Sequence, residues 1–242
     1  MKMVCFGVDI SDNDVSCSDE LIKSIKDSLY KIEKMGAKFA RLTNITGDDV
    51  VITAVIEDDT KLEDVNYAIY HLLCDCALGF EDLNGVGKTP QDAGEGISYT
   101  SIDINDAYLP DAVIVAFDTY CGESFVDDVA KQALDAACGI RSVGDSAMSV
   151  IDGKIKEIPG VGYVSSQTDD PVVVVAVEDV HQVGVVAGAM MGAILGYKNT
   201  YLTNHHTPAK VIPGSVIFTV TALLNGNVID LSDIFNHRMQ IL

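Results

Sequence analysis

The sequence predicts a single α/β (α+β) domain over residues 1–242, with mixed sheets covered by helices. Two observations predict it. Apolar segments of strand length alternate with amphipathic segments of helix length, and no linker rich in proline or serine divides the chain. With 242 residues, of which 48% are hydrophobic, the chain is long and apolar enough to bury a large core. We therefore expect one compact domain.

The first hundred residues alternate clearly between strands and helices. Ser18 is a favoured helix N-cap, and Gly36 and Gly79 stand where two helices are expected to end. The segment Thr46-Gly47-Asp48-Asp49 is short enough to turn an antiparallel hairpin. We expect helices over residues 18–35 and 61–78, and strands over residues 3–9, 38–45, 50–57 and 97–104.

The second half repeats these elements less regularly. Asp152-Gly153 predicts the turn of a small hairpin over residues 148–158, and Asn225-Gly226 predicts the turn of a closing hairpin over residues 216–229. The valine-rich run at residues 171–177 is typical of a strand buried on both faces. The remaining expected elements are a strand over residues 112–118 and helices over residues 123–138 and 180–195.

The last of these helices carries a glycine every four residues along one face: Gly184, Gly188, Gly192 and Gly196. Each glycine costs a helix about 1 kcal/mol relative to alanine. We therefore expect close packing against this face, by another helix of the chain or by a second subunit of an oligomer. The apolar run at residues 183–195 is too short to span a membrane.

The composition restricts the classes of partner. The chain has 36 acidic and 16 basic residues and a formal net charge of −20, which disfavours nucleic acid and anionic membrane surfaces. Solubility alone can account for such a charge, and a multi-carboxylate metal site can account for part of it. Six scattered cysteines and the lack of a signal-peptide pattern favour reduced thiols in the cytoplasm.

Aspartates stand at the ends of several predicted strands. Strand ends present side chains to a common crevice, and hard cations prefer carboxylate oxygens. We expect these residues to converge and to hold Mg²⁺ or Mn²⁺, with more than one ion bound. The alternative is that aspartate is simply common in turns. The candidate ligands are Asp9, Asp48, Asp49, Asp118, Asp169 and Asp170.

Two further acidic residues, Glu81 and Asp82, open a glycine-rich segment at residues 80–96, and we count them as possible additional ligands. This segment resembles a phosphate-binding loop only at Gly87-Lys88-Thr89, because Asp82 stands where that motif needs a glycine. A long loop of this kind can cover a site. His205-His206 is interpreted as a solvated loop pair, and the alternative is a ligand role for one of the two histidines. No Ser/His/Asp or Cys/His arrangement stands out, so catalytic residues are not assigned.

Taken together, these motifs resemble the bifunctional fructose-1,6-bisphosphate aldolase/phosphatase family of archaea and deeply branching bacteria. The resemblance runs nearly from end to end and implies a four-layer α-β-β-α fold, several magnesium ions held by the aspartates, and a cytoplasmic homo-oligomer. The matching segments, in the order of the family, are Val8-Asp9-Ile10, Gly47-Asp48-Asp49, Phe80-Glu81-Asp82-Leu83, Asp118, Asp169-Asp170-Pro171-Val172 and the terminal run from Gly226 to Phe235.

The chain departs from that family at the position of the Schiff-base lysine, which is Thr168 here, and it lacks about a hundred residues of the second half. In that family a lysine also follows the strand-ending aspartate, and at the matching position this chain has Thr119, directly after Asp118. We therefore expect no aldolase activity, and predict a magnesium-dependent, phosphatase-like hydrolase acting on a small phosphorylated or anionic metabolite. The alternative is a non-catalytic paralogue of the same fold that binds a metal or metabolite or acts in assembly.

Overall fold

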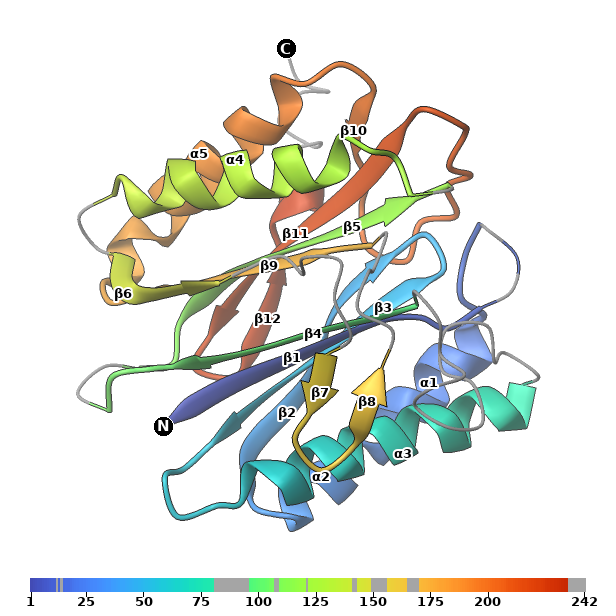
Figure 1. The fold of residues 1–242 in the computed structure, drawn as a ribbon, viewed down its shortest axis with the longest axis vertical. Coiled ribbons are helices and arrows are strands. Elements are labelled where there is room, and N and C mark those ends of the chain that lie inside the picture. Colours follow the sequence, from blue (N-terminus) through green and yellow to red (C-terminus); the bar gives the residue numbers. More distant parts are fainter. Residues whose placement is uncertain are drawn as a thin grey trace.

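Four layers make up the molecule, with two β-sheets stacked face to face between two layers of helices (Figure 1). The expected α+β class and the α-β-β-α layering are therefore confirmed. This description comes from a computed structural model and covers residues 1–11, 13, 15–80, 96–106, 109–120, 122–140, 143–148, 156–164 and 170–234.

The first sheet is antiparallel throughout, in the order β2-β3-β1-β4. Three helices cover its outer face, at the bottom of Figure 1. The strands are β1 (Lys2–Asp9), β2 (Ala37–Thr46), β3 (Asp49–Ile56) and β4 (Ile97–Asp103), and the helices are α1 (Asp19–Ser28), α2 (Tyr30–Lys34) and α3 (Leu62–Phe80).

The second sheet follows the order β10-β11-β5-β9-β6, and β12 also pairs with β11. It is mixed, because β10 runs parallel to β11 while the other pairs are antiparallel. Helices α4 (Val126–Cys138) and α5 (Val183–Leu195) cover its outer face. The strands are β5 (Ala112–Thr119), β6 (Val143–Met148), β9 (Val172–Val177), β10 (Thr200–Leu202), β11 (Val216–Leu224) and β12 (Asn227–Asp230).

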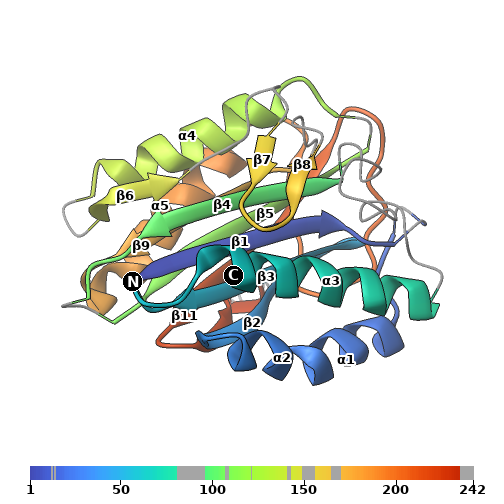
Figure 2. The same ribbon diagram turned by 60° about the horizontal axis from the view of Figure 1, so that its bottom comes forward.

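Two smaller elements complete the fold. A short 3-10 helix, η2 (Val180–Gln182), leads into α5. The hairpin of β7 (Lys156–Ile158) and β8 (Gly162–Val164) lies over α3 (Figure 2). It is fixed there by Asn66 of α3, whose Nδ2 donates to the carbonyl of Pro159 at 3.0 Å.

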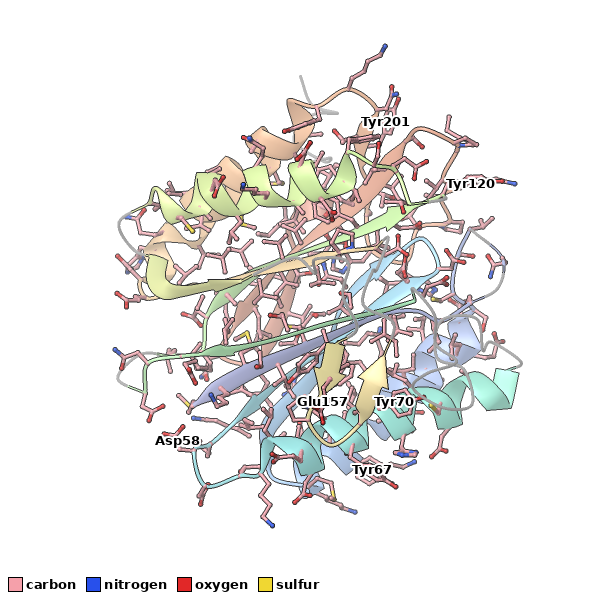
Figure 3. All side chains as sticks on the ribbon, in the orientation of Figure 1. Asp58, Tyr67, Tyr70, Tyr120, Glu157 and Tyr201 are labelled. Carbon is pink, nitrogen blue, oxygen red and sulfur yellow. The ribbon has the colours of Figure 1, made fainter. Side chains whose placement is uncertain are left out.

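Three hydrophobic clusters separate the four layers, and the alternation of side chains along each strand explains them. On β1, Val4, Phe6 and Val8 face the helices, whereas Met3 and Cys5 face the second sheet. Side chains from both sheets fill the space between them (Figure 3). Every second residue of β1, counted from Met3 to the end of the strand, therefore faces the second sheet.

Most predicted elements are present with small shifts of their ends. Ser18 caps α1, since its Oγ accepts from the backbone N–H of Leu21 at 3.1 Å, and Gly36 adopts a left-handed φ of 111° after α2. The helix expected over residues 18–35 is divided at Leu29 into α1 and α2. Leu202 ends β10, a three-residue strand that the sequence did not predict because it is so short.

The described ends of the small hairpin predicted over residues 148–158 pair with other strands instead of with each other. β7 pairs with β8 through the turn at residues 159–161, and β6 pairs with the central strand β9. The turn chemistry of Asp152-Gly153 suggested a local pairing, but the buried valines of β9 give β6 a larger apolar surface to pair with. Residues 149–155 lie outside the described part of the chain.

The glycine face of α5 has no packing partner within the described part of this chain. A Cβ built on Gly184, Gly188 or Gly192 would meet nothing within 4 Å beyond the backbone of its own helix. No described helix is long and apolar enough to cross a membrane.

One side of the layer between the sheets is polar instead of apolar. Asn44 Nδ2 donates to Thr219 Oγ1 at 3.0 Å, and the hydroxyls of Thr46 and Thr219 lie 2.7 Å apart. The Thr221 hydroxyl donates to the carbonyl of Thr43 at 2.7 Å. These contacts join β2 to β11, so they fix how the two sheets are aligned.

His205 extends this polar seam toward the surface. Its Nε2 lies 3.0 Å from Thr221 Oγ1. Because the proton of that hydroxyl is used for Thr43, the histidine donates to Thr221 from Nε2. Burial lowers the pKa of His205, and the nearby Asp230 opposes this effect.

We expect acid to destabilise the protein through His205. Since its folded pKa lies below that of the unfolded chain, the unfolded state binds more protons as the pH falls below about 6.5, and stability is lost. The variant His205→Gln should lose less stability between pH 7.5 and pH 5.5 than the native chain, as measured by urea unfolding. The variant His181→Gln, at an exposed histidine, is the control. Equal acid sensitivity of His205→Gln and the native chain would contradict the prediction.

Candidate metal centre

Sheet register brings two predicted aspartates side by side in the first sheet. Asp9 ends β1 and lies directly opposite Asp49, the first residue of β3. Asp9 is in phase with Met3 and Cys5, and Asp49 is in phase with Val51. Both carboxylates therefore lie on the face of the first sheet that packs against the second sheet.

The second sheet places two more acids at the same end of the molecule. Asp118 lies near the end of β5, in phase with Ala116, which faces the first sheet. Asp170 lies two residues before Val172, the first residue of the antiparallel partner β9. Its Oδ1 accepts from the backbone N–H of Thr119 at 2.7 Å, which fixes the carboxylate beside the end of β5.

The β2–β3 turn adds the fifth carboxylate. Gly47 has a φ of 57°, a left-handed conformation that glycine adopts readily, and Asp48 follows it. The carbonyl of Asp48 accepts from the Cys17 thiol at 3.2 Å and from the backbone N–H of Ile10 at 3.4 Å. The turn is thus anchored to the segment that follows β1.

Asp48, Asp49 and Asp118 form a compact set of oxygen ligands. Each offers one carboxylate oxygen, and these atoms all lie within 4.8 Å of one another. The three residues are 5%, 5% and 4% exposed. Two oxygens that bind one ion at about 2.0–2.1 Å, the range of Mg²⁺, lie at most about 4.2 Å apart, so these atoms are close to the spacing that one such ion needs.

The raised pKa of Asp49 shows that the neighbouring carboxylates repel its ionised form. Burial raises the pKa of Asp49 well above its ordinary value, and Asp170, Asp118, Asp9 and Asp48 raise it further. Its Oδ1 is buried without a hydrogen-bond partner among the described residues. An ionised oxygen in that position is costly unless a cation compensates it. The donor set therefore fits a hard divalent ion.

The structure thus brings together all the predicted aspartates that it describes, namely Asp9, Asp48, Asp49, Asp118 and Asp170. The other predicted ligands, Asp169, Glu81 and Asp82, lie outside the described residues. Cys17 was not predicted, and its sequence position gives no signal, because 31 residues separate it from the carbonyl that it contacts.

Comparison with known proteins places this chain among archaeal sequences. The family described as Uncharacterised conserved protein UCP005278 matches residues 2–239. An "Uncharacterized protein" of Methanothermobacter thermautotrophicus is 53% identical over 242 residues, which cover 100% of this chain and 98% of that protein. A second "Uncharacterized protein", from Methanocaldococcus jannaschii, is 41% identical over 230 residues, covering 95% of this chain and 94% of the relative.

Neutralising Asp49 should stabilise the metal-free protein. Because its folded pKa is raised, the ionised carboxylate destabilises the fold increasingly as the pH rises above the ordinary aspartate range, and Asp49→Asn removes that repulsion. We expect a higher Tm than that of the native chain at pH 7.5 in EDTA, with each kcal/mol gained worth about 2–4 °C. The same variant should lose the Tm increase that Mg²⁺ or Mn²⁺ gives the native protein.

The matched control is Asp135→Asn, which changes the net charge equally at an exposed position on α4. It should leave both melting temperatures almost unchanged. A metal-free Asp49→Asn protein that melts below the native chain would contradict this account of the site.

Gly47 should be needed to place Asp118. A Cβ at Gly47 would lie 1.9 Å from Asp118 Oδ2, so Gly47→Ala must displace that carboxylate. We expect metal affinity, measured by calorimetry, to fall by at least about 10-fold. Gly214→Ala is the control, because Gly214 is also left-handed, with a φ of 81°, but a Cβ there meets nothing within 4 Å.

Both glycine variants should lose about 1–2 kcal/mol of stability from backbone strain. Only Gly47→Ala should lose metal. Equal metal affinity in the two variants would show that Asp118 is not a ligand.

Proposed function

This chain belongs to the family Uncharacterised conserved protein UCP005278, and from that premise we propose that it is a Mg²⁺- or Mn²⁺-dependent, phosphatase-like hydrolase of small phosphorylated or anionic metabolites. The observation that carries the proposal is the buried Oδ1 of Asp49, which has no hydrogen-bond partner among the described residues and lies in a set of closely spaced carboxylates. Such an oxygen is a ligand position.

Asp48, Asp49 and Asp118 would hold the metal, and Asp9 and Asp170 are near enough to raise the pKa of Asp49 and to contribute to a second ion. A bound divalent ion supplies positive charge for the oxygens of a phosphoryl group and lowers the pKa of a water molecule for attack. The protein contributes orientation, since Thr119 fixes Asp170 and Gly47 leaves room for Asp118.

The substrate class follows from charge. The carboxylates repel a free anion, so the anionic group must bind directly to the metal ions. With a net charge of −20, nucleic acid is an unsuitable partner, and a small metabolite is favoured. Among the described cysteines, Cys5, Cys74, Cys76 and Cys138 are free thiols, which suits the reducing cytoplasm where we place this protein.

A non-catalytic protein of the same fold is the second candidate. It would keep the metal site and use it to bind a metabolite without turnover. The open glycine face of α5, which has no role in hydrolysis, favours an assembly function of this kind.

The test has two stages and uses the full chain stripped with EDTA. Calorimetry with Mg²⁺ and Mn²⁺ should show binding, and Asp118→Asn should weaken it by at least about 10-fold, with Asp135→Asn as the control. A panel of phosphorylated metabolites is then tested for release of inorganic phosphate with each metal. We expect release by the native chain and little by Asp118→Asn.

The outcomes separate the candidates. Metal binding without phosphate release from any substrate would reject the hydrolase and leave the non-catalytic protein. A lack of metal binding, or unchanged binding in Asp118→Asn, would reject both.

A further inference from the structure

Helix α5 presents an apolar surface to solvent. Its sequence, VGVVAGAMMGAIL, contains no polar side chain. Val183, Val186, Ala187, Met190 and other inward residues pack on the second sheet, and yet the outward side is equally apolar. Val185 there is 54% exposed and Leu195 is 38% exposed.

The glycines on this surface are not explained by packing within the described chain. Glycine is disfavoured in a helix relative to alanine. Alanine would fit at Gly184, Gly188 and Gly192, because a Cβ at each would meet nothing within 4 Å beyond the backbone of its own helix. What a glycine does provide is a surface that another backbone can approach closely.

The neighbouring helix shows that an apolar exterior is not a general property of this layer. α4 lies beside α5 on the same sheet (Figure 1), but its outward positions are mostly polar or charged. The exposed residues of α4 include Asp127, Asp128, Lys131, Gln132 and Asp135. The apolar surface is therefore confined to α5.

Charge indicates what covers this face. The chain carries a net charge of −20, so two copies repel one another over most of their surfaces, but α5 carries no charge. Its flanks are complementary, with Glu178 exposed before its first residue and Lys198 exposed after its last. Glu178 and Lys198 lie beyond opposite ends of α5. An antiparallel crossing of two α5 helices would therefore bring the acidic end of each helix toward the basic end of the other.

We propose that the glycine face of α5 is the interface of a two-fold symmetric homodimer, with α5 packed antiparallel against α5 of a second copy. A two-fold axis places the same surface of both subunits in contact, so the glycine face of one copy would pack against the glycine face of the other. A helix of 13 residues is about 20 Å long, less than the roughly 30 Å of a bilayer core, so insertion across a membrane does not account for it.

Sedimentation velocity on the full chain tests the proposal. The native protein should sediment as a dimer of 25.9 kDa subunits at micromolar concentration. Gly188→Leu should raise the dissociation constant by about 100-fold or more, because the added side chain separates the helices. Gln132→Leu, which adds the same side chain to the exposed side of α4, should remain dimeric. Circular dichroism checks that each variant is folded.

Charge exchange tests the orientation even if Gly188→Leu fails to fold. Glu178→Lys alone and Lys198→Glu alone should each raise the dissociation constant by about 10-fold, and the double variant should restore it. A native chain that is monomeric at all concentrations would overturn the proposal. So would a dimer that persists in Gly188→Leu, or single charge variants that bind as tightly as the native chain.

Discussion

Mutual repulsion among carboxylates at one end of the inter-sheet layer is the constraint on which the rest of this structure depends. Asp49 is surrounded by four other aspartates that each raise its pKa, and one of its oxygens is buried without a hydrogen-bond partner among the described residues. Such an arrangement is costly unless the carboxyl is protonated or a cation compensates its charge, and it needs rigid surrounding layers to hold the groups in place. The rigidity is visible in the architecture.

Rigidity comes from the way the two sheets are joined. Apolar side chains fill most of the space between them, while hydroxyl and amide contacts between β2 and β11 fix their alignment. Because Asp49 and Asp118 come from different sheets, any sliding of one sheet over the other would change their separation. The polar seam thus contributes to the geometry of the aspartate cluster as well as to stability.

Excess negative charge characterises both the aspartate cluster and the outer surface of the molecule. A net charge of −20 helps to keep the protein soluble and also makes self-association costly everywhere except at an uncharged face. The outward side of α5 is such a face, and it lies on the far side of the second sheet from the aspartates (Figure 1). A dimer formed there would leave the centre free to bind metal and a small anion.

The sequence by itself determined the fold class, most strands and helices, the Ser18 cap, the two Gly-containing hairpin turns and which aspartates stand at strand ends, because these depend on local periodicity and turn chemistry. It did not determine that β6 pairs with β9, or that a Cβ on Gly47 would strike Asp118, or that Cys17 contacts the carbonyl of Asp48. These contacts join residues far apart in the chain, so only the tertiary structure decided them. The first is a pairing within the second sheet, the second results from the stacking of the two sheets, and the third packs the segment after β1 against the β2–β3 turn. The same stacking turned the strand-end aspartates into one buried cluster, since it sets which faces meet.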